Sequence, residues 1–287
     1  MIPFVKMKNA RMYLTSNPMQ RKDAEEVLSE LTHTFTWSEG EKVLDVGSGP
    51  GDVTVNVLKK FAPPDATIIG SDILEEMVEY GNAHFKTSRI KFRKLDIQGS
   101  YIWDHWEKGS FSKIFSFYCL HWIQDQKKAA ENIHSLLKAD GELLATFLSH
   151  NPVFKLYLSL SQTIKWSHYM KDVEFYISPY HQCDDPAALY AKLLKSVDFS
   201  EVKVYNKNTS FLYPSKESMI GNCRAPEEKT NSICAVNPFL ERIPNEEQAD
   251  YRKCISDFVD CLNLAEKQEN GNYRVDYSLL VARAKKV

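Results

Sequence analysis

Apolar residues along this 287-residue chain follow two patterns in turn, short strand-like segments and helical spacing. Short apolar or alternating segments are typical of strands, and they occur at 43–46, 67–71, 90–95, 113–117, 142–147, 201–205 and 273–284, the last of which alternates. Between them, apolar residues recur at helical spacing in segments that begin at Pro18, near Asp125, at Pro186 and at Glu246. Strands that alternate with helices form an α/β fold. We therefore predict a seven-stranded sheet, mostly parallel with an antiparallel last strand, with helices on both faces.

Capping residues mark where several of these helices begin. Asn17 and Pro18 fit the N-cap and the first helical position, and Gln20 fits the position of a capping-box glutamine. The helix near Asp125 is expected to end before Asp140–Gly141. Two helices should each bury one apolar face. In the helix that begins at Pro186 this face consists of Leu189, Leu193, Leu194 and Val197. In the helix over 246–267 it consists of Tyr251, Ile255, Phe258, Val259 and Leu262.

The segment VLDVGSGPGDVT, residues 43–54, contains Gly47, Gly49 and Gly51 between an apolar run and the next helix. A strand, a tight turn and a helix start in this order are typical of nucleotide-like cofactor sites. A P-loop would need a lysine after the glycines, and none follows. A dinucleotide site would need its third glycine one position later, and Asp52 would repel a pyrophosphate at the start of the helix.

Acidic residues follow three of the predicted strands at their carboxyl ends, where open α/β sheets bind ligands. S-adenosylmethionine has a sulfonium, an ammonium and no phosphate, so it suits this loop, and Asp45 can face its ammonium group. Asp72 ends the second strand, where a ribose-binding acid is expected. Asp96 and Ile97 follow the third strand and suit an adenine amino group and ring face. Asp72 or Asp96 alone could equally be a helix or turn cap.

Several longer stretches indicate a narrower relationship. They are MQRKDA (19–24), FSFYCLHWIQDQ (115–126), NPVFKLY (151–157), FYISPYHQCDDP (175–186) and AVNPFLERIP (235–244). With the glycine loop, they resemble the class I S-adenosylmethionine-dependent methyltransferases and, more closely, the juvenile hormone acid methyltransferases. This resemblance implies a Rossmann-like fold with a helical substrate cap. The stretch at 222–234 departs from the family pattern because it is longer and more polar than expected before AVNPF.

The glycine loop, the strand ends and the resemblance together give a set of expected site residues. The expected cofactor contacts are Asp45, Gly47, Ser48, Gly49, Asp72, Ile73, Asp96, Ile97 and Ser116. The expected substrate contacts are Gln20, Tyr118, Trp122 and Tyr157, and the family's carboxylate-orienting residues match Gln20 and Trp122. No metal is expected to take part.

The resemblance implies an isoprenoid acid as substrate, either farnesoic acid or a juvenile hormone acid. A carboxylic acid is ionised at neutral pH, so its methylation needs no general base. The enzyme must instead align a carboxylate oxygen with the sulfonium methyl group, and hydrogen-bond donors suit that task. Gln20, His121 and Trp122 are the candidates. Gln20 has the capping box as a rival role, and His121 equally fits a histidine of the core.

We expect a single methyltransferase domain over 1–287, with its cofactor-binding core at 36–150. Two insertions, at 151–181 and 211–267, interrupt its alternation of strands and helices. Segments of this kind can enclose an apolar substrate. The first insertion is rich in aromatic residues, namely Phe154, Tyr157, Trp166, Tyr169, Phe175, Tyr176 and Tyr180. Each of them alone could equally be an ordinary packing residue of a helix.

Composition narrows the class of protein further. A net charge of −2 makes nucleic acid an unexpected partner. We expect a cytoplasmic protein, because the six cysteines form no C-x-x-C pair. The sequence also shows no apolar run of membrane-spanning length and no pattern of a secretory leader. A homodimer stays open. The alternatives to an isoprenoid acid methyltransferase are a related enzyme that acts on another small acid, a phenol or an amine, and a cofactor-binding protein without catalysis.

Overall fold

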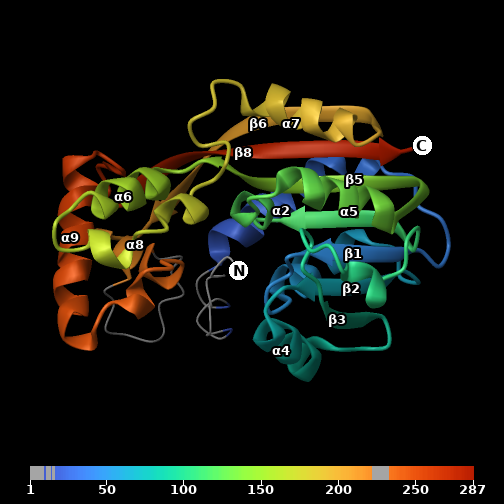
Figure 1. Ribbon diagram of the computed structural model, residues 1–287, viewed down its shortest axis with the longest axis horizontal. Helices are drawn as coiled ribbons and strands as arrows, with labels where there is room; N and C mark the ends of the chain where they lie inside the picture. The colour runs from blue at the N-terminus through green and yellow to red at the C-terminus, as the bar shows by residue number, and fades with distance from the viewer. Residues whose placement is uncertain (1–9, 11–13, 15–16, 222–232) are drawn as a thin grey trace. The chain divides into compact units, whose positions relative to one another are not determined.

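The computed structural model describes residues 10, 14, 17–221 and 233–287 of the chain (Figure 1). Residues 222–232 of the polar stretch at 222–234, noted above as a departure from the family pattern, lie outside the described residues. The chain divides into two compact units. The sheet unit comprises Gln20–Ser149, Cys183–Lys207 and Leu279–Val287, and the insertion unit comprises the described residues up to Met19, His150–Gln182, and the described residues of 208–278.

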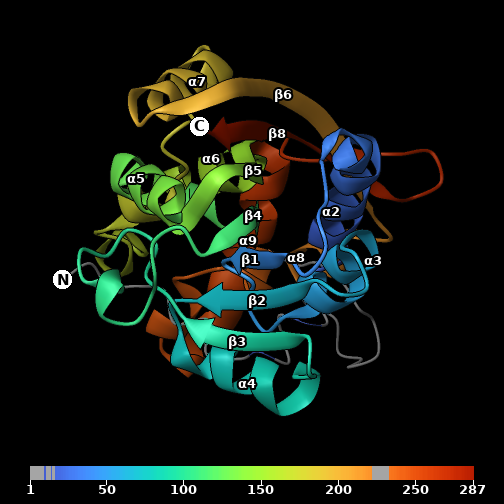
Figure 2. The ribbon, with the colours of Figure 1, turned by 90° about the vertical axis from the view of Figure 1, so that its right-hand side faces the viewer.

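The sheet confirms the predicted topology. Its main strands are β1 (Lys42–Val46), β2 (Thr67–Asp72), β3 (Ile90–Lys94), β4 (Phe111–Phe117), β5 (Leu137–His150), β6 (Phe199–Tyr213) and β8 (Tyr273–Lys286). They lie in the order β3-β2-β1-β4-β5-β8-β6, which Figure 2 shows from one end of the sheet to the other. The first five strands pair in parallel, and β8 is antiparallel to its neighbours. One short strand, β7 (Glu266–Lys267), adds to the expected seven by pairing with β8.

The register of β1 explains why the predicted acids share one edge of the sheet. Asp45 pairs with Gly70 of β2 and with Phe115 of β4, so β1, β2 and β4 end close together. The core beneath this edge is apolar, and it includes Leu28, Val43 and Ile68, all at most 1% exposed. Parallel strands buried on both faces require such continuous apolar sequences. The core therefore fixes where the strand ends lie.

Three helices of the sheet unit begin close to where the sequence places them, namely α2 (Pro18–Leu31), α5 (Gln126–Leu136) and α7 (Pro186–Ser196). The unit also contains α3 (Lys59–Phe61) and α4 (Glu75–Phe85). The Asp125 side chain accepts a hydrogen bond from the Lys128 N–H at 2.9 Å and so caps α5. Leu189, expected on the buried face of α7, is 48% exposed, because α7 buries Pro186, Tyr190 and Leu194 instead.

The insertion unit contains α6 (Pro152–Ser161), α8 (Lys216–Ile220) and α9 (Gln248–Cys261). The helix expected over 246–267 is shorter than predicted, since Asn263 adopts a left-handed conformation with φ of 50° and the chain then forms β7. The centre of the unit is aromatic: Phe239 is fully buried and makes edge-to-face contacts with Tyr157 and Tyr176. No helix within the described ranges is long and apolar enough to cross a membrane.

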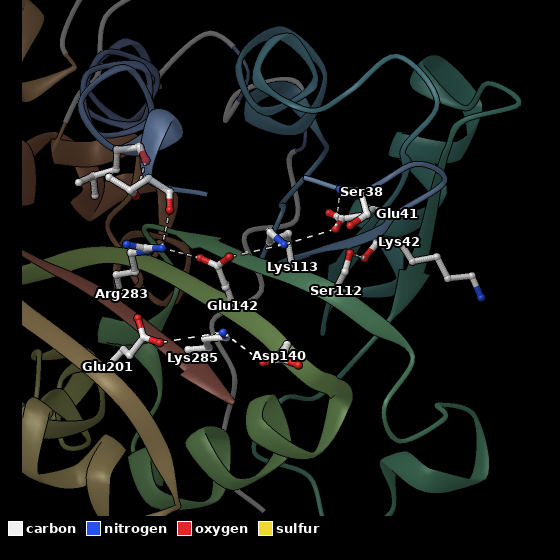
Figure 3. A network of polar contacts seen from close by, with 12 residues as sticks. Ser38, Glu41, Lys42, Ser112, Lys113, Asp140, Glu142, Glu201, Arg283 and Lys285 are labelled. Carbon is white, nitrogen blue, oxygen red and sulfur yellow. Dashed lines mark hydrogen bonds and ion pairs between the residues drawn. The ribbon is translucent and has the colours of Figure 1, made fainter. Parts of the chain in front are cut away.

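A buried network of charges lies at the amino-terminal end of β1 and β4 in the sheet unit (Figure 3). The Lys113 ammonium lies 3.5 Å from Glu41 and 3.7 Å from Glu142, and all three side chains are less than 8% exposed. Arg283 makes a 2.7 Å ion pair with the other oxygen of Glu142 and donates to the Thr34 carbonyl. Each buried charge thus has an opposite partner, and the network fixes the connection from α2 to β1 on the sheet.

Candidate active site

The glycine loop after β1 has a conformation that only glycine adopts easily. Gly47, Gly49 and Gly51 have φ values of 75°, 54° and 99°. A β carbon on Gly47 would lie 2.3 Å from the Cys119 side chain, and one on Gly51 would lie 2.4 Å from Phe92. The loop is tied to β2, because the Gly47 and Ser48 N–H groups both donate to the Ser71 carbonyl at 2.8 Å. Its backbone is therefore fixed, and glycine is needed at positions 47 and 51 because Cys119 and Phe92 pack directly against them.

Asp45 is a buried carboxylate at the end of β1. It is 1% exposed, and one of its oxygens accepts a hydrogen bond from the Thr54 hydroxyl at 2.6 Å. Burial raises the pKa of Asp45 to about 7, the Thr54 hydrogen bond lowers it, and the nearby charge of Asp72 raises it. Thr54 begins a π-helical turn, Thr54–Leu58, just after the loop. A ligand with positive charge would stabilise the ionised form of this carboxylate.

Asp72 connects β2 to the glycine loop. Its Oδ2 accepts from the Gly49 N–H at 3.0 Å, and its Oδ1 accepts from the Leu74 N–H at 2.9 Å. Desolvation raises the pKa of Asp72 in spite of hydrogen bonds from the backbone of Leu74, Gly49 and Ile73. A carboxylate has about four lone-pair sites, so about one remains for a ligand hydroxyl group. Ile73 follows it and is half-buried.

Asp96 and Ile97 form the turn after β3. The Oδ1 of Asp96 accepts from the Gln98 N–H at 3.2 Å, and burial raises the pKa of its carboxyl group. Ile97 is 3% exposed, and its carbonyl accepts from the Asn132 side chain at 2.7 Å. The same Asn132 amide also donates to the Gly99 carbonyl at 2.9 Å, so α5 fixes the shape of this turn.

The end of β4 carries four of the expected site residues. The Ser116 hydroxyl is fully buried and donates to the Val46 carbonyl at 2.9 Å. Tyr118, at φ of 55°, occupies the left-handed region that is uncommon for a residue with a β carbon. A short 3₁₀ turn, Leu120–Trp122, follows it, and the His121 and Trp122 rings lie 4.6 Å apart between their centroids.

His121 is a neutral side chain at physiological pH. It is 2% exposed, and burial lowers its pKa to about 3. Its Nδ1 accepts a hydrogen bond from the Leu148 N–H at 3.4 Å, which places the proton of the neutral ring on Nε2. A histidine with such a low pKa is a poor general base at neutral pH. The site therefore suits a substrate that needs no deprotonation.

Gln20 lies in the first turn of α2 and is 6% exposed. Its Oε1 is buried without a hydrogen-bond partner among the described residues. A capping-box glutamine would use this oxygen to accept the N-cap N–H, so the structure does not show the rival capping role. A buried amide with an unused acceptor is costly unless a ligand or water completes its bonding.

Tyr157 belongs to the insertion unit, is fully buried, and its hydroxyl lies 3.4 Å from the Val236 carbonyl. The other expected residues all belong to the sheet unit. Sequence analysis missed Thr54, which bonds to Asp45, and Cys119, which packs on Gly47. Both lie inside stretches that were singled out; Thr54 and Asp45 belong to the same stretch, whereas Cys119 and Gly47 are far apart in the chain.

Comparisons with known proteins agree with this geometry. Residues 38–190 match the family model of a methyltransferase domain. The chain is 35% identical to a juvenile hormone acid O-methyltransferase of Bombyx mori, covering 98% of both chains. It is 37% identical to the Drosophila melanogaster protein of the same name, covering 98% of this chain and 93% of the relative. The chain belongs to the juvenile hormone acid O-methyltransferase family. It is thus one of the S-adenosylmethionine-dependent methyltransferases.

Solved structures show the same fold at much lower identity. The YcgJ protein of Bacillus subtilis has a TM-score of 0.55 and 17% identity, covering 91% of this chain and 98% of its own. The fold described here is therefore shared with this solved protein. The residues at the ligand-binding edge of the present sheet also fit S-adenosylmethionine, since two desolvated carboxylates, Asp45 and Asp72, suit a cationic ligand that carries a ribose.

Proposed function

We propose that this protein is a carboxyl O-methyltransferase that converts an isoprenoid acid, farnesoic acid or a juvenile hormone acid, to its methyl ester. The similarity to two juvenile hormone acid O-methyltransferases along nearly the whole chain carries the proposal. The neutral His121 supports it, because a carboxylate is already ionised and needs no base. A phenol or amine substrate would lack that base here.

S-adenosylmethionine, when bound, supplies an electrophilic methyl group. We assign its amino acid moiety to Asp45 and the loop Gly47–Gly49, its ribose to Asp72, and its adenine to Ile73 with Asp96 and Ile97. Ser116 supports this site through β1, because its hydroxyl is bonded to the Val46 carbonyl. The position of these residues at the ends of strands supports the assignment. For Asp45, Asp72 and Asp96 the raised pKa of the carboxyl group supports it as well.

Gln20 and Trp122 are proposed to orient the substrate carboxylate by donating hydrogen bonds to it. Gln20 is buried in the first turn of α2, and its side-chain NH₂ group is the donor that this role requires. Trp122 ends the 3₁₀ turn after β4, and its indole N–H is a donor only, which suits an anion. The hydrogen bond from the Leu148 N–H to the His121 ring ties this turn to β5. Correct alignment of oxygen and methyl group is a large part of the catalytic effect in such reactions.

The apolar chain of the substrate is proposed to contact aromatic residues of the insertions 151–181 and 211–267, Tyr157 among them. Tyr118 would contribute its ring, because its hydroxyl donates to Asp23. We also propose that the chain works as one methyltransferase domain with its cofactor core at 36–150, in the cytoplasm and without a metal or nucleic acid. Cell fractionation tests the cytoplasmic location, and activity in the presence of a chelator tests the independence from metal.

A panel of acceptors tests the proposed reaction. Labelled methyl transfer is measured with farnesoic acid, with farnesol, which has the same chain but an alcohol head, and with acids of decreasing chain length. We expect transfer to farnesoic acid, none to farnesol, and a kcat/KM that falls as the chain shortens. Faster transfer to a phenol or an amine than to any acid would contradict the proposal.

A further inference from the structure

A buried carboxylate, Asp23, links the two elements that carry the proposed carboxylate-orienting residues. Asp23 lies one helical turn after Gln20 in α2 and is fully buried. It accepts a hydrogen bond from the hydroxyl of Tyr118, which follows β4 and is 7% exposed. The two residues are 95 positions apart in the chain. Their bond joins the first turn of α2 to the end of the strand that leads to Trp122.

The hydrogen bond to Asp23 helps to hold Tyr118 in an unfavourable backbone conformation. Its left-handed conformation is unfavourable for a residue with a β carbon and persists only where surrounding contacts determine it. Contacts that hold it include the hydrogen bond from the Tyr118 backbone N–H to the Thr146 carbonyl of β5 at 2.8 Å and the bond from its side chain to Asp23. The change of chain direction at Tyr118 leads the following residues into the 3₁₀ turn. In this turn the backbone N–H of Trp122 donates to the Cys119 carbonyl at 3.0 Å.

We infer that Asp23 is a positioning residue for methyl transfer. Through the Tyr118 hydroxyl it fixes the α2 turn that carries Gln20 relative to the 3₁₀ turn that carries Trp122. The spacing between these two donors must match the two oxygens of a single carboxylate, so a shift of either turn would misalign the attacking oxygen. This inference rests on the proposed function, because it assumes that Gln20 and Trp122 bind the substrate carboxylate. Asp23 and Tyr118 then act as one unit.

The charge on Asp23 is part of the argument. A hydrogen bond from a phenol to an ionised carboxylate is stronger than one between neutral groups. The Lys22 ammonium lies 3.7 Å from the Oδ1 of Asp23 and forms an ion pair with it. Asp23→Asn keeps the size of the side chain and removes the charge, whereas Tyr118→Phe keeps the ring and removes only the donor. Both changes are small enough for the α2 core to pack as before.

A double-mutant cycle tests the inference. Asp23→Asn, Tyr118→Phe and the double variant are compared with the wild type in kcat and KM for farnesoic acid, in S-adenosylhomocysteine affinity by calorimetry, and in melting temperature. Tyr205→Phe is the matched control, because it removes a phenol hydroxyl from the exposed face of β6. We expect each single change to lower kcat about 10- to 100-fold, with unchanged affinity for the cofactor product. The double variant should be no slower than the slower single variant.

Fluorine NMR of fluorotryptophan-labelled protein provides a readout that needs no substrate. The Trp122 resonance is assigned by its loss in Trp122→Phe, and Asp23→Asn and Tyr118→Phe should shift it to the same new position. Additive losses of kcat, or an unmoved Trp122 resonance, would overturn the inference. If the wild type methylates no acid while both variants shift Trp122 equally, the proposed substrate is wrong and the link between the two turns stands.

Discussion

Replacing Asp45 with asparagine should stabilise the protein at neutral pH while weakening its binding of the cofactor. Burial raises the pKa of Asp45 from 3.8 to about 7, so ionising it costs more in the folded than in the unfolded chain. A difference of about three pKa units corresponds to about 4 kcal/mol at about 1.4 kcal/mol per unit. Asparagine avoids this cost and can still accept the hydrogen bond from Thr54.

The sign of the pH dependence follows from proton linkage. Between pH 4 and pH 7 the folded wild type binds the Asp45 proton more tightly than the unfolded chain does, so this group's contribution to stability falls as the pH rises. Below pH 4 both states are protonated, and the contribution is fully present. The variant has no such group. The stability difference in favour of Asp45→Asn should therefore be near zero at pH 4 and grow to about 2–4 kcal/mol at pH 8.

Denaturant unfolding of both proteins, without ligand and at pH values from 4 to 8, measures this difference. Calorimetry with S-adenosylhomocysteine at pH 8 measures the accompanying loss of affinity, since a carboxylate near the ligand ammonium is removed. Unfolding free energies that run parallel with pH would refute the reasoning about burial. A less stable Asp45→Asn at pH 8 would refute it as well. Unchanged affinity would remove Asp45 from the cofactor site.

Three further changes test separate parts of the structure. Asp72→Ala should abolish S-adenosylhomocysteine binding in calorimetry, because Asp72 also fixes the Gly49 N–H, and unchanged affinity would exclude it from the site. Gln20→Ala should raise the barrier to turnover by about 1–3 kcal/mol, the scale of one hydrogen bond to a charged group, without altering cofactor affinity; a loss confined to melting temperature would instead indicate a structural role. Lys113→Met should cost about 3–5 kcal/mol in unfolding free energy, since it leaves Glu41 and Glu142 buried without this partner, and a variant as stable as the wild type would show that the network tolerates the loss.

The sequence was sufficient to predict the sheet and the positions of its acids. The strands β1 to β4 coincide with predicted strands, and Asp45, Asp72 and Asp96 lie at or just after the ends of β1, β2 and β3 as expected. These features depend on local sequence and on parallel topology, both of which can be inferred from pattern. The turn at Gly47 was recognisable for the same reason.

Other features depend on contacts between distant segments, which local pattern does not encode. The bond between Asp23 and Tyr118 and the pairing of Lys113 with Glu41 join residues 95 and 72 positions apart. The exposure of Leu189 follows from how α7 packs, since several faces of that helix are apolar. Asp52 provides a further example: it was expected to repel an anion, yet Arg21 lies 3.5 Å from it and partly neutralises its charge.

The reaction itself is tested most directly by following a labelled methyl group in a single turnover, with enzyme in excess over S-adenosylmethionine and farnesoic acid present. A methyl ester releases labelled methanol when treated with alkali, whereas a methyl ether or a methylated amine does not. We predict that the label enters an organic-soluble product and that alkali then releases it as methanol. Label that stays on the cofactor, or that enters an alkali-stable product, would contradict the account.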